Sequence, residues 1–246
     1  MSTTIVIVIA VMLFGAFIRT VFGFGDALVA MPMLALISFD LKTSTALIGF
    51  IGLLVAIPAT FKYRSEINWS VIKRLVIGSL FGVPVGIILV KYIDVSTVGR
   101  ILGVFLLIYS SYSLIRTMRS QMIQLKLHSK IWDYLFGLFS GILGSAFDSH
   151  GVAVAIYGTL KDWSANEFRG ILQSHFMCVS VIVVSSQMIS GFWNMEVVKL
   201  VLITIPFLFV LIPFSNWVST KIDSASMVKY VYGLLLLFGI MLTIKG

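Results

Sequence analysis

Charged residues are scarce in this sequence. Only 11% of its 246 residues are charged, while 59% are hydrophobic, and the mean hydropathy is +1.06. A soluble domain needs more polar surface than this composition supplies, so a soluble globular fold is excluded. The long apolar runs predict an all-α polytopic membrane protein with about 8 to 10 membrane segments.

Cysteine and nucleotide-binding motifs are also scarce or missing. Cysteine occurs once, as Cys178 inside an apolar run, which excludes an intrachain disulfide framework. The sequence contains no G-x-x-x-x-G-K-[ST] loop, which argues against intrinsic ATP-driven pumping. We therefore expect no cofactor and no metal, and the protein is not predicted to be an enzyme.

The formal net charge is +8, but the basic residues lie in short loops between apolar runs. The loops with the most lysine and arginine are 62–74 and 116–130. Positively charged loops stay on the cytoplasmic side of the membrane. Both loops are therefore predicted to face the cytoplasm of a bacterium, and the N and C termini to lie on the outer side of its inner membrane. Topology thus explains the charge, and the predicted partner is the lipid bilayer and not a nucleic acid.

Two glycine-containing breaks interrupt the apolar runs at matching places in the two halves of the chain. The first is Gly23-Phe24-Gly25-Asp26, and the second is Gly144-Ser145-Ala146-Phe147-Asp148. A carboxylate at bilayer depth is costly, so each aspartate is a candidate functional residue. The alternative is that each one only caps the helix that follows it.

Short matches in the same order along both halves indicate an internal repeat. Gly15 and Asp26 pair with Gly137 and Asp148 at one common spacing. Further along, Pro84 pairs with Pro213. The predicted units are a first membrane repeat at 1–118, a basic cytoplasmic linker at 119–130 and a second membrane repeat at 131–246. They are interpreted as inverted, because the counterpart of the basic loop 62–74 has a single basic residue.

One segment after each break is too short to span a bilayer comfortably. Residues 27–39 and 149–160 would extend about 18 to 20 Å as helices. Each could cross the membrane at a tilt or return as a re-entrant hairpin, and both readings leave the termini on the same side.

The glycine-rich motif resembles that of the sulfite exporter TauE/SafE family of membrane transporters. That family has the pattern G-x-x-x-G-x-G-G-G near the start of each half. The first copy here is similar from Gly15 to Pro32, and the second from Gly137 to Gly151. The sequence departs from the pattern at Asp26 and Ala27 and at 148–150, where other residues replace or interrupt the glycines. The resemblance implies transport of sulfite, organosulfonates or related small anions.

Broken helices supply free backbone N–H groups and a positive dipole end, which suit an anion. The predicted substrate-binding residues lie at the breaks, in the preceding helix and in the segment that follows the second half's short helix: Arg19, Gly23, Gly25, Asp26, Gly144, Asp148, Ser149, His150, Gly151, Gln173 and His175. Proton coupling is assigned to Asp148 and His150. The plainer alternatives are that Arg19 snorkels to the interface, and that the histidines and Gln173 make structural hydrogen bonds.

The predicted function is secondary transport, as an exporter, of a small anion such as sulfite or an organosulfonate, coupled to protons. One alternative is a sodium- or cation-coupled carrier in which Asp26 and Asp148 bind the ion. Another is an intramembrane enzyme that uses Asp148, Ser149 and His150 for acyl chemistry.

Overall fold

The computed structural model describes residues 3–118, 127, 129–161, 163–221 and 224–245, and every regular element among them is helical. The predicted linker 119–130 lies mostly outside these residues. The elements are α1 (Thr3–Phe22), α2 (Asp26–Leu36), α3 (Leu41–Lys62), the 3₁₀ turn η1 (Arg64–Glu66), α4 (Trp69–Tyr92), α5 (Val95–Met118), α6 (Ile131–Phe147), α7 (His150–Leu160), α8 (Ala165–Ile189), α9 (Met195–Ser219) and α10 (Ser224–Lys245).

Six helices within the described residues are long and apolar enough to cross a membrane: α1, α3, α4, α5, α8 and α9. The helices α2 and α7 have 11 residues each, which corresponds to about 16 Å of helix. Neither is long enough to cross the roughly 30 Å hydrocarbon core upright. The prediction of an all-helical, multi-span membrane protein is confirmed.

Polar side chains at the helix starts explain why the long helices begin where they do. Asp40 accepts from the backbone N–H of Thr43 at 2.7 Å before α3, and Asn194 accepts from that of Val197 at 2.9 Å before α9. Such N-caps satisfy a backbone donor that the first helical turn leaves free. The caps fix the helix registers and, with them, which side chains enter the core.

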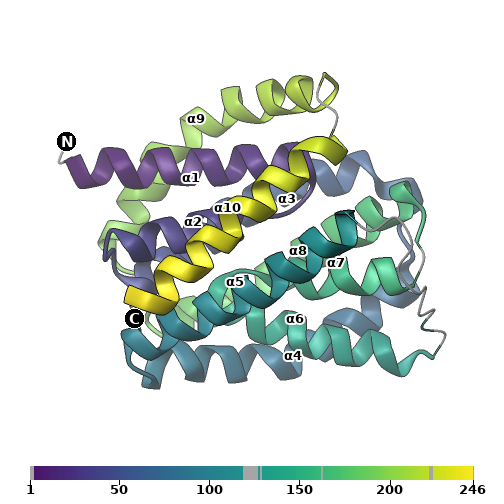
Figure 1. Ribbon diagram of the computed structural model, residues 1–246, viewed down its shortest axis with the longest axis horizontal. Helices are drawn as coiled ribbons and strands as arrows, with labels where there is room; N and C mark the ends of the chain where they lie inside the picture. The colour runs from purple at the N-terminus through teal and green to yellow at the C-terminus, as the bar shows by residue number, and fades with distance from the viewer. Residues whose placement is uncertain (1–2, 119–126, 128, 162, 222–223, 246) are drawn as a thin grey trace.

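The helices form one elongated array in which the two halves of the chain interleave (Figure 1). Helix α4 packs against α6, α1 against α9, α3 against α8, and α5 against α10. The start of α1 and the end of α10 lie at one end of the array, on the left of Figure 1, and the end of α5 and the start of α6 lie toward the other. Each half therefore obtains most of its packing from the other.

Glycine contacts allow the α4–α6 pair to approach closely. A Cβ added at Gly82 would collide with the backbone of Leu138, and one added at Gly141 would come within 2.8 Å of Ser79 Cα. The Ser145 hydroxyl donates across the interface to the Val83 carbonyl at 2.9 Å. Close backbone approach of this kind drives helix association in lipid, where a hydrophobic force between helices is lacking.

A buried carboxylate joins three helices at the end of the array that holds the basic loop. Asp133 on α6 has no exposed side-chain surface. It accepts from Arg74 Nε on α4 and from the Tyr157 hydroxyl on α7. Because both oxygens have partners, the carboxylate is satisfied in place.

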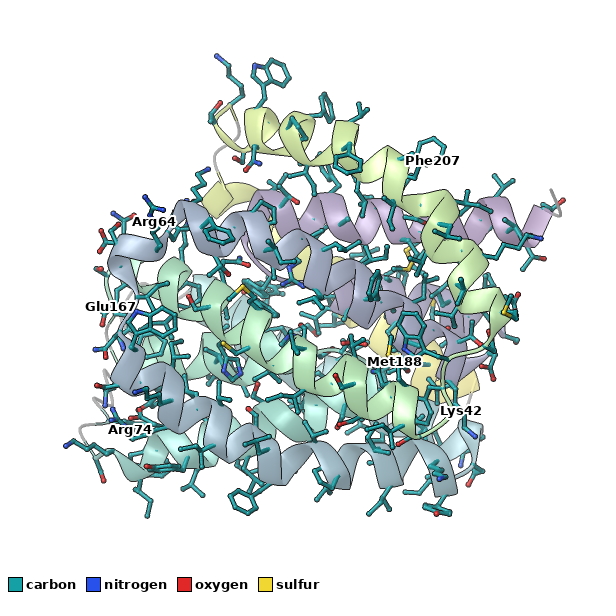
Figure 2. The ribbon with its side chains drawn as sticks, turned by 180° about the vertical axis from the view of Figure 1, so that it is seen from behind. Lys42, Arg64, Arg74, Glu167, Met188 and Phe207 are labelled. Carbon is teal, nitrogen blue, oxygen red and sulfur yellow. The ribbon has the colours of Figure 1, made fainter. Side chains whose placement is uncertain are left out.

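The outer surface matches a bilayer environment. Large apolar side chains on α9 are exposed, with Phe209 at 77% and Val210 at 74%. Figure 2 shows Phe207 pointing away from the array, while Arg64 and Arg74 lie at one end and Lys42 at the other. Apolar sides with charged ends are the pattern of a polytopic membrane protein.

We predict that Gly82→Ala destabilises the protein by about 1–3 kcal/mol, because the new methyl meets backbone that cannot rotate away. Gly99→Ala is the matched control, since a Cβ at Gly99 meets nothing within 4 Å. Thermal unfolding in detergent measures both. Equal midpoints for Gly82→Ala and Gly99→Ala would contradict the packing role.

Candidate functional site

Left-handed backbone ends the helix before each break. In the first break the φ angles are 88° at Gly23 and 104° at Gly25, values that glycine adopts without strain. In the second break Asp148 itself takes this conformation, with φ 52°. Aspartate is among the few other residues that tolerate this region, at a cost of about 1–2 kcal/mol.

The two breaks meet inside the helix array. Together they line a small space of about 10 Å³ whose walls include Gly25, Asp26, Asp148, Ser149 and Phe176. A space of this size holds about one water molecule. The two breaks therefore face each other in the described structure.

Arg19 is a buried partner of Asp26 and does not snorkel to the interface. Its side chain is 1% exposed, and its Nη1 donates to Asp26 Oδ2 at 2.6 Å. The guanidinium carbon also lies 4.0 Å from the ring centre of Phe176 on α8. The snorkelling interpretation is therefore wrong, because an ion pair and an aromatic face replace the water that the cation would otherwise seek.

Neither aspartate is the N-cap of the helix that follows. Gly25 is the N-cap of α2 and Ser149 that of α7, and neither makes a side-chain capping bond. Asp26 is the first helical residue and turns to Arg19 instead, while Asp148 is the C-cap of α6. The capping-only interpretation is wrong for both residues.

Part of the Arg19 guanidinium has no protein partner. Its Nε and Nη2 atoms are buried and donate to no acceptor within the described residues. Arg19 also lines a cavity of about 210 Å³ at the end of the array that carries the basic loop. Lys62, Arg169 and Gln173 line the same cavity, and none of the carboxylates among the described residues does.

Asp148 differs from Asp26 in having no partner. It is 3% exposed, and neither carboxylate oxygen has a hydrogen bond among the described residues. Both oxygens lie against Gly49 of α3, where an added Cβ would be 2.9 Å from each. Arg19, Asp26 and the Gln187 amide are the other groups that act on this carboxyl. An ionised carboxylate in such a position is costly.

The two histidines do not line the space between the breaks. The His150 ring is 4.6 Å from the Phe176 ring, and its Nε2 is 3.3 Å from Ser180 Oγ. The His175 Nε2 is 2.7 Å from Ser140 Oγ, which donates to the His150 carbonyl at 2.8 Å. These contacts give both rings a place in the core.

The remaining predicted residues mostly shape the backbone. The Gln173 Nε2 donates to the Gly23 carbonyl at 2.7 Å and so ties α8 to the first break. The Ser149 hydroxyl donates to the Phe147 carbonyl at 3.2 Å, away from His150. Gly151 packs against the Phe176 ring. A Cβ added at Gly144 would lie 2.8 Å from the His150 Cβ.

Sequence reasoning missed the contribution of α3 and, on α8, that of Phe176. Gly49 contacts Asp148, and a Cβ at Gly52 would be 2.9 Å from Arg19 Nη1 and 3.1 Å from Asp26 Oδ2. These two glycines are three residues apart, so they share one helix face. That spacing was the available signal, whereas nothing local to Phe176 marks it.

A multi-span helical chain whose two breaks meet in its interior, with buried charges at the meeting point, has the form of a membrane transporter. The sequence profile of the sulfite exporter TauE/SafE family matches residues 7–242 of this chain. The chain therefore belongs to that family of transmembrane transporters, as its motifs predicted. Comparison with the curated proteins and with the solved structures gives no match.

We predict that Gly49→Ala destabilises the protein through Asp148. The added methyl must displace the carboxyl group, at a cost of about 1–2 kcal/mol. Thermal unfolding of the purified protein should show the loss in the wild-type background.

A double-mutant cycle with Asp148→Gly tests the route of the effect. Glycine fits the left-handed backbone at this position and removes the carboxyl group, so Gly49→Ala should then have little effect. The same loss in both backgrounds would show that Gly49 acts through other contacts.

Proposed function

We propose that this protein is a secondary transporter that exports a small sulfur oxyanion, sulfite or an organosulfonate, from the cytoplasm. The observation that carries the proposal is the buried Arg19, which pairs with Asp26 through Nη1 and leaves Nε and Nη2 without partners. Membership of the TauE/SafE family supports the substrate class.

The two unpartnered nitrogens of Arg19 form one complete edge of the guanidinium group. The N–H bonds of Nε and Nη2 lie parallel in one plane, a geometry that matches two oxygens of an oxyanion. Buried donors without partners are rare and costly. A bound oxyanion would satisfy both, which gives this edge a role beyond holding Asp26.

The basic cavity supports entry from the cytoplasmic side. Lys62, Arg169 and Arg19 line it, and it opens at the end of the array that holds the basic loop 62–74. A cavity at the other end, of about 530 Å³, is lined by Ser38, Ser44 and Asp40 among others and by no cation. Positive potential on one side raises the local anion concentration there.

We infer an inverted repeat from how the halves pack. If α1–α5 correspond in order to α6–α10, the pairs α1·α9 and α4·α6 exchange with each other, and α3·α8 and α5·α10 map onto themselves. The short helices α2 and α7 occupy equivalent places after the two breaks. This arrangement supports repeats at 1–118 and 131–246, both termini outside, and alternating access by motion of one repeat against the other.

Asp148 is proposed to carry the coupling proton. Its carboxyl group lacks a hydrogen-bond partner and shares the space between the breaks with Asp26. An anion on Arg19 would be repelled by a second ionised carboxylate, so a neutral Asp148 favours loading. Gly49 lies against both oxygens, so a larger side chain at that position would displace this carboxyl group.

We predict that Arg19→Lys raises the KM for sulfite about tenfold in proteoliposomes. The ammonium keeps the charge beside Asp26, which protects the fold, but it cannot present two parallel N–H donors. Arg64→Lys is the control, since Arg64 is exposed and does not line the cavity. An unchanged KM for Arg19→Lys would reject the bidentate role.

We further predict that Asp148→Asn keeps anion exchange but abolishes the stimulation of uptake by a pH gradient. Asparagine tolerates the left-handed backbone and imitates the protonated acid, yet it cannot release a proton. Counterflow measures exchange and a pH jump measures coupling. If the variant still responds to the pH jump as wild type does, Asp148 is not the coupling residue.

A further inference from the structure

Two cations from different helices meet over one tyrosine at the mouth of the basic cavity. The Lys62 Nζ, at the end of α3, lies 5.5 Å from the ring centre of Tyr63. The guanidinium of Arg169, in the second turn of α8, lies 5.8 Å from the same ring and donates to its hydroxyl at 3.1 Å. The tyrosine therefore holds both cations at the rim of the cavity.

These cations are not neutralised by protein carboxylates. In the described part of the chain, the ion pairs within 4.0 Å are those of Arg19 with Asp26 and of Arg74 with Asp133. Glu66 and Glu167 lie nearby in the chain, but neither lines the cavity. Uncompensated cations that converge on one concave surface form a favourable place for an anion.

The cavity extends from this rim to Arg19. Its other polar walls include Asn216 of α9, whose side-chain amide can donate hydrogen bonds, and Gln173 of α8. The nearby Ser219 and Thr220 hydroxyls already donate to the Asn216 and Trp217 carbonyls. Arg19 also lines it, and the Nε and Nη2 atoms of this residue are buried without a hydrogen-bond partner among the described residues. The volume of about 210 Å³ far exceeds the single-water space between the breaks.

We propose that Lys62, Tyr63 and Arg169 form an outer binding site for small oxyanions, separate from the inner edge of Arg19. This site captures the anion from the cytoplasm and delivers it to Arg19. The proposal rests on the proposed transport function. In this proposal, the outer site sets the affinity for anions that arrive from the cytoplasmic side. The inner site at Arg19 acts in translocation.

The test compares Lys62→Gln and Arg169→Gln with wild type in inside-out and right-side-out membrane vesicles. Sulfite entering from the cytoplasmic face should show a KM raised about five- to tenfold with kcat nearly unchanged, and sulfite entering from the opposite face should show an unchanged KM. Arg64→Gln is the control for charge on the same face. Lys91→Gln is a second control, because Lys91 lies 5.6 Å from the Tyr92 ring at the other end of the array.

A binding measurement separates the outer site from transport. The double variant Arg19→Met with Asp26→Asn removes both buried charges together, which avoids an unpaired ion. By titration calorimetry in detergent, this protein should still bind sulfite or sulfate weakly, and it should lose that binding when Lys62→Gln and Arg169→Gln are added.

The outcomes distinguish the two proposals. If Lys62→Gln and Arg169→Gln behave as Arg64→Gln does while Arg19→Lys impairs transport, the outer site is wrong and the proposed function stands. If the Arg19 and Asp26 double variant binds no oxyanion although wild type does, the outer site is again wrong. A wild-type protein that neither binds nor transports sulfite or sulfate overturns both.

Discussion

The ion pair between Arg19 and Asp26 is the interaction on which the interior of this protein depends. Two charges at bilayer depth are tolerated only as a pair, and their 2.6 Å contact crosses the first helix break. The pair fixes where α2 begins relative to α1. Phe176 of α8 packs on the Arg19 guanidinium. The position of α8, in the second half of the chain, is therefore tied to a charged residue of the first half.

Helix α3 makes this arrangement compact. Gly52 lies against the ion pair and Gly49 against Asp148, so one face of a single helix contacts the charged groups of both breaks. Any larger side chain at either position would occupy the place of a carboxylate oxygen or a guanidinium nitrogen. The site therefore depends on two positions that have no side chain, and the Asp148 carboxyl group is held there without a hydrogen bond from the described residues.

The sequence predicted the helical membrane class, the two breaks and the residues at them, because glycines and a carboxylate in an apolar run are local signals. It also predicted the right family. It could not decide between an Arg19 that snorkels and one that pairs with Asp26, since both place the arginine on the same helix. Nor could it assign Phe176, Gly49 or the cations around Tyr63 to one region, because only tertiary packing brings α3 and α8 together. For the same reason it could not show that the two histidines stay out of the space between the breaks.

The local nature of the ion pair also has a consequence for biosynthesis. Arg19 and Asp26 are seven residues apart, so they can neutralise each other as soon as the α1–α2 hairpin leaves the ribosome. The hairpin then enters the bilayer as a neutral unit. By contrast, the face of α1 that contacts α9 and the face of α4 that contacts α6 are buried only after those later helices are present. Insertion of the first half and its final packing are therefore separate events, and the second half completes the first.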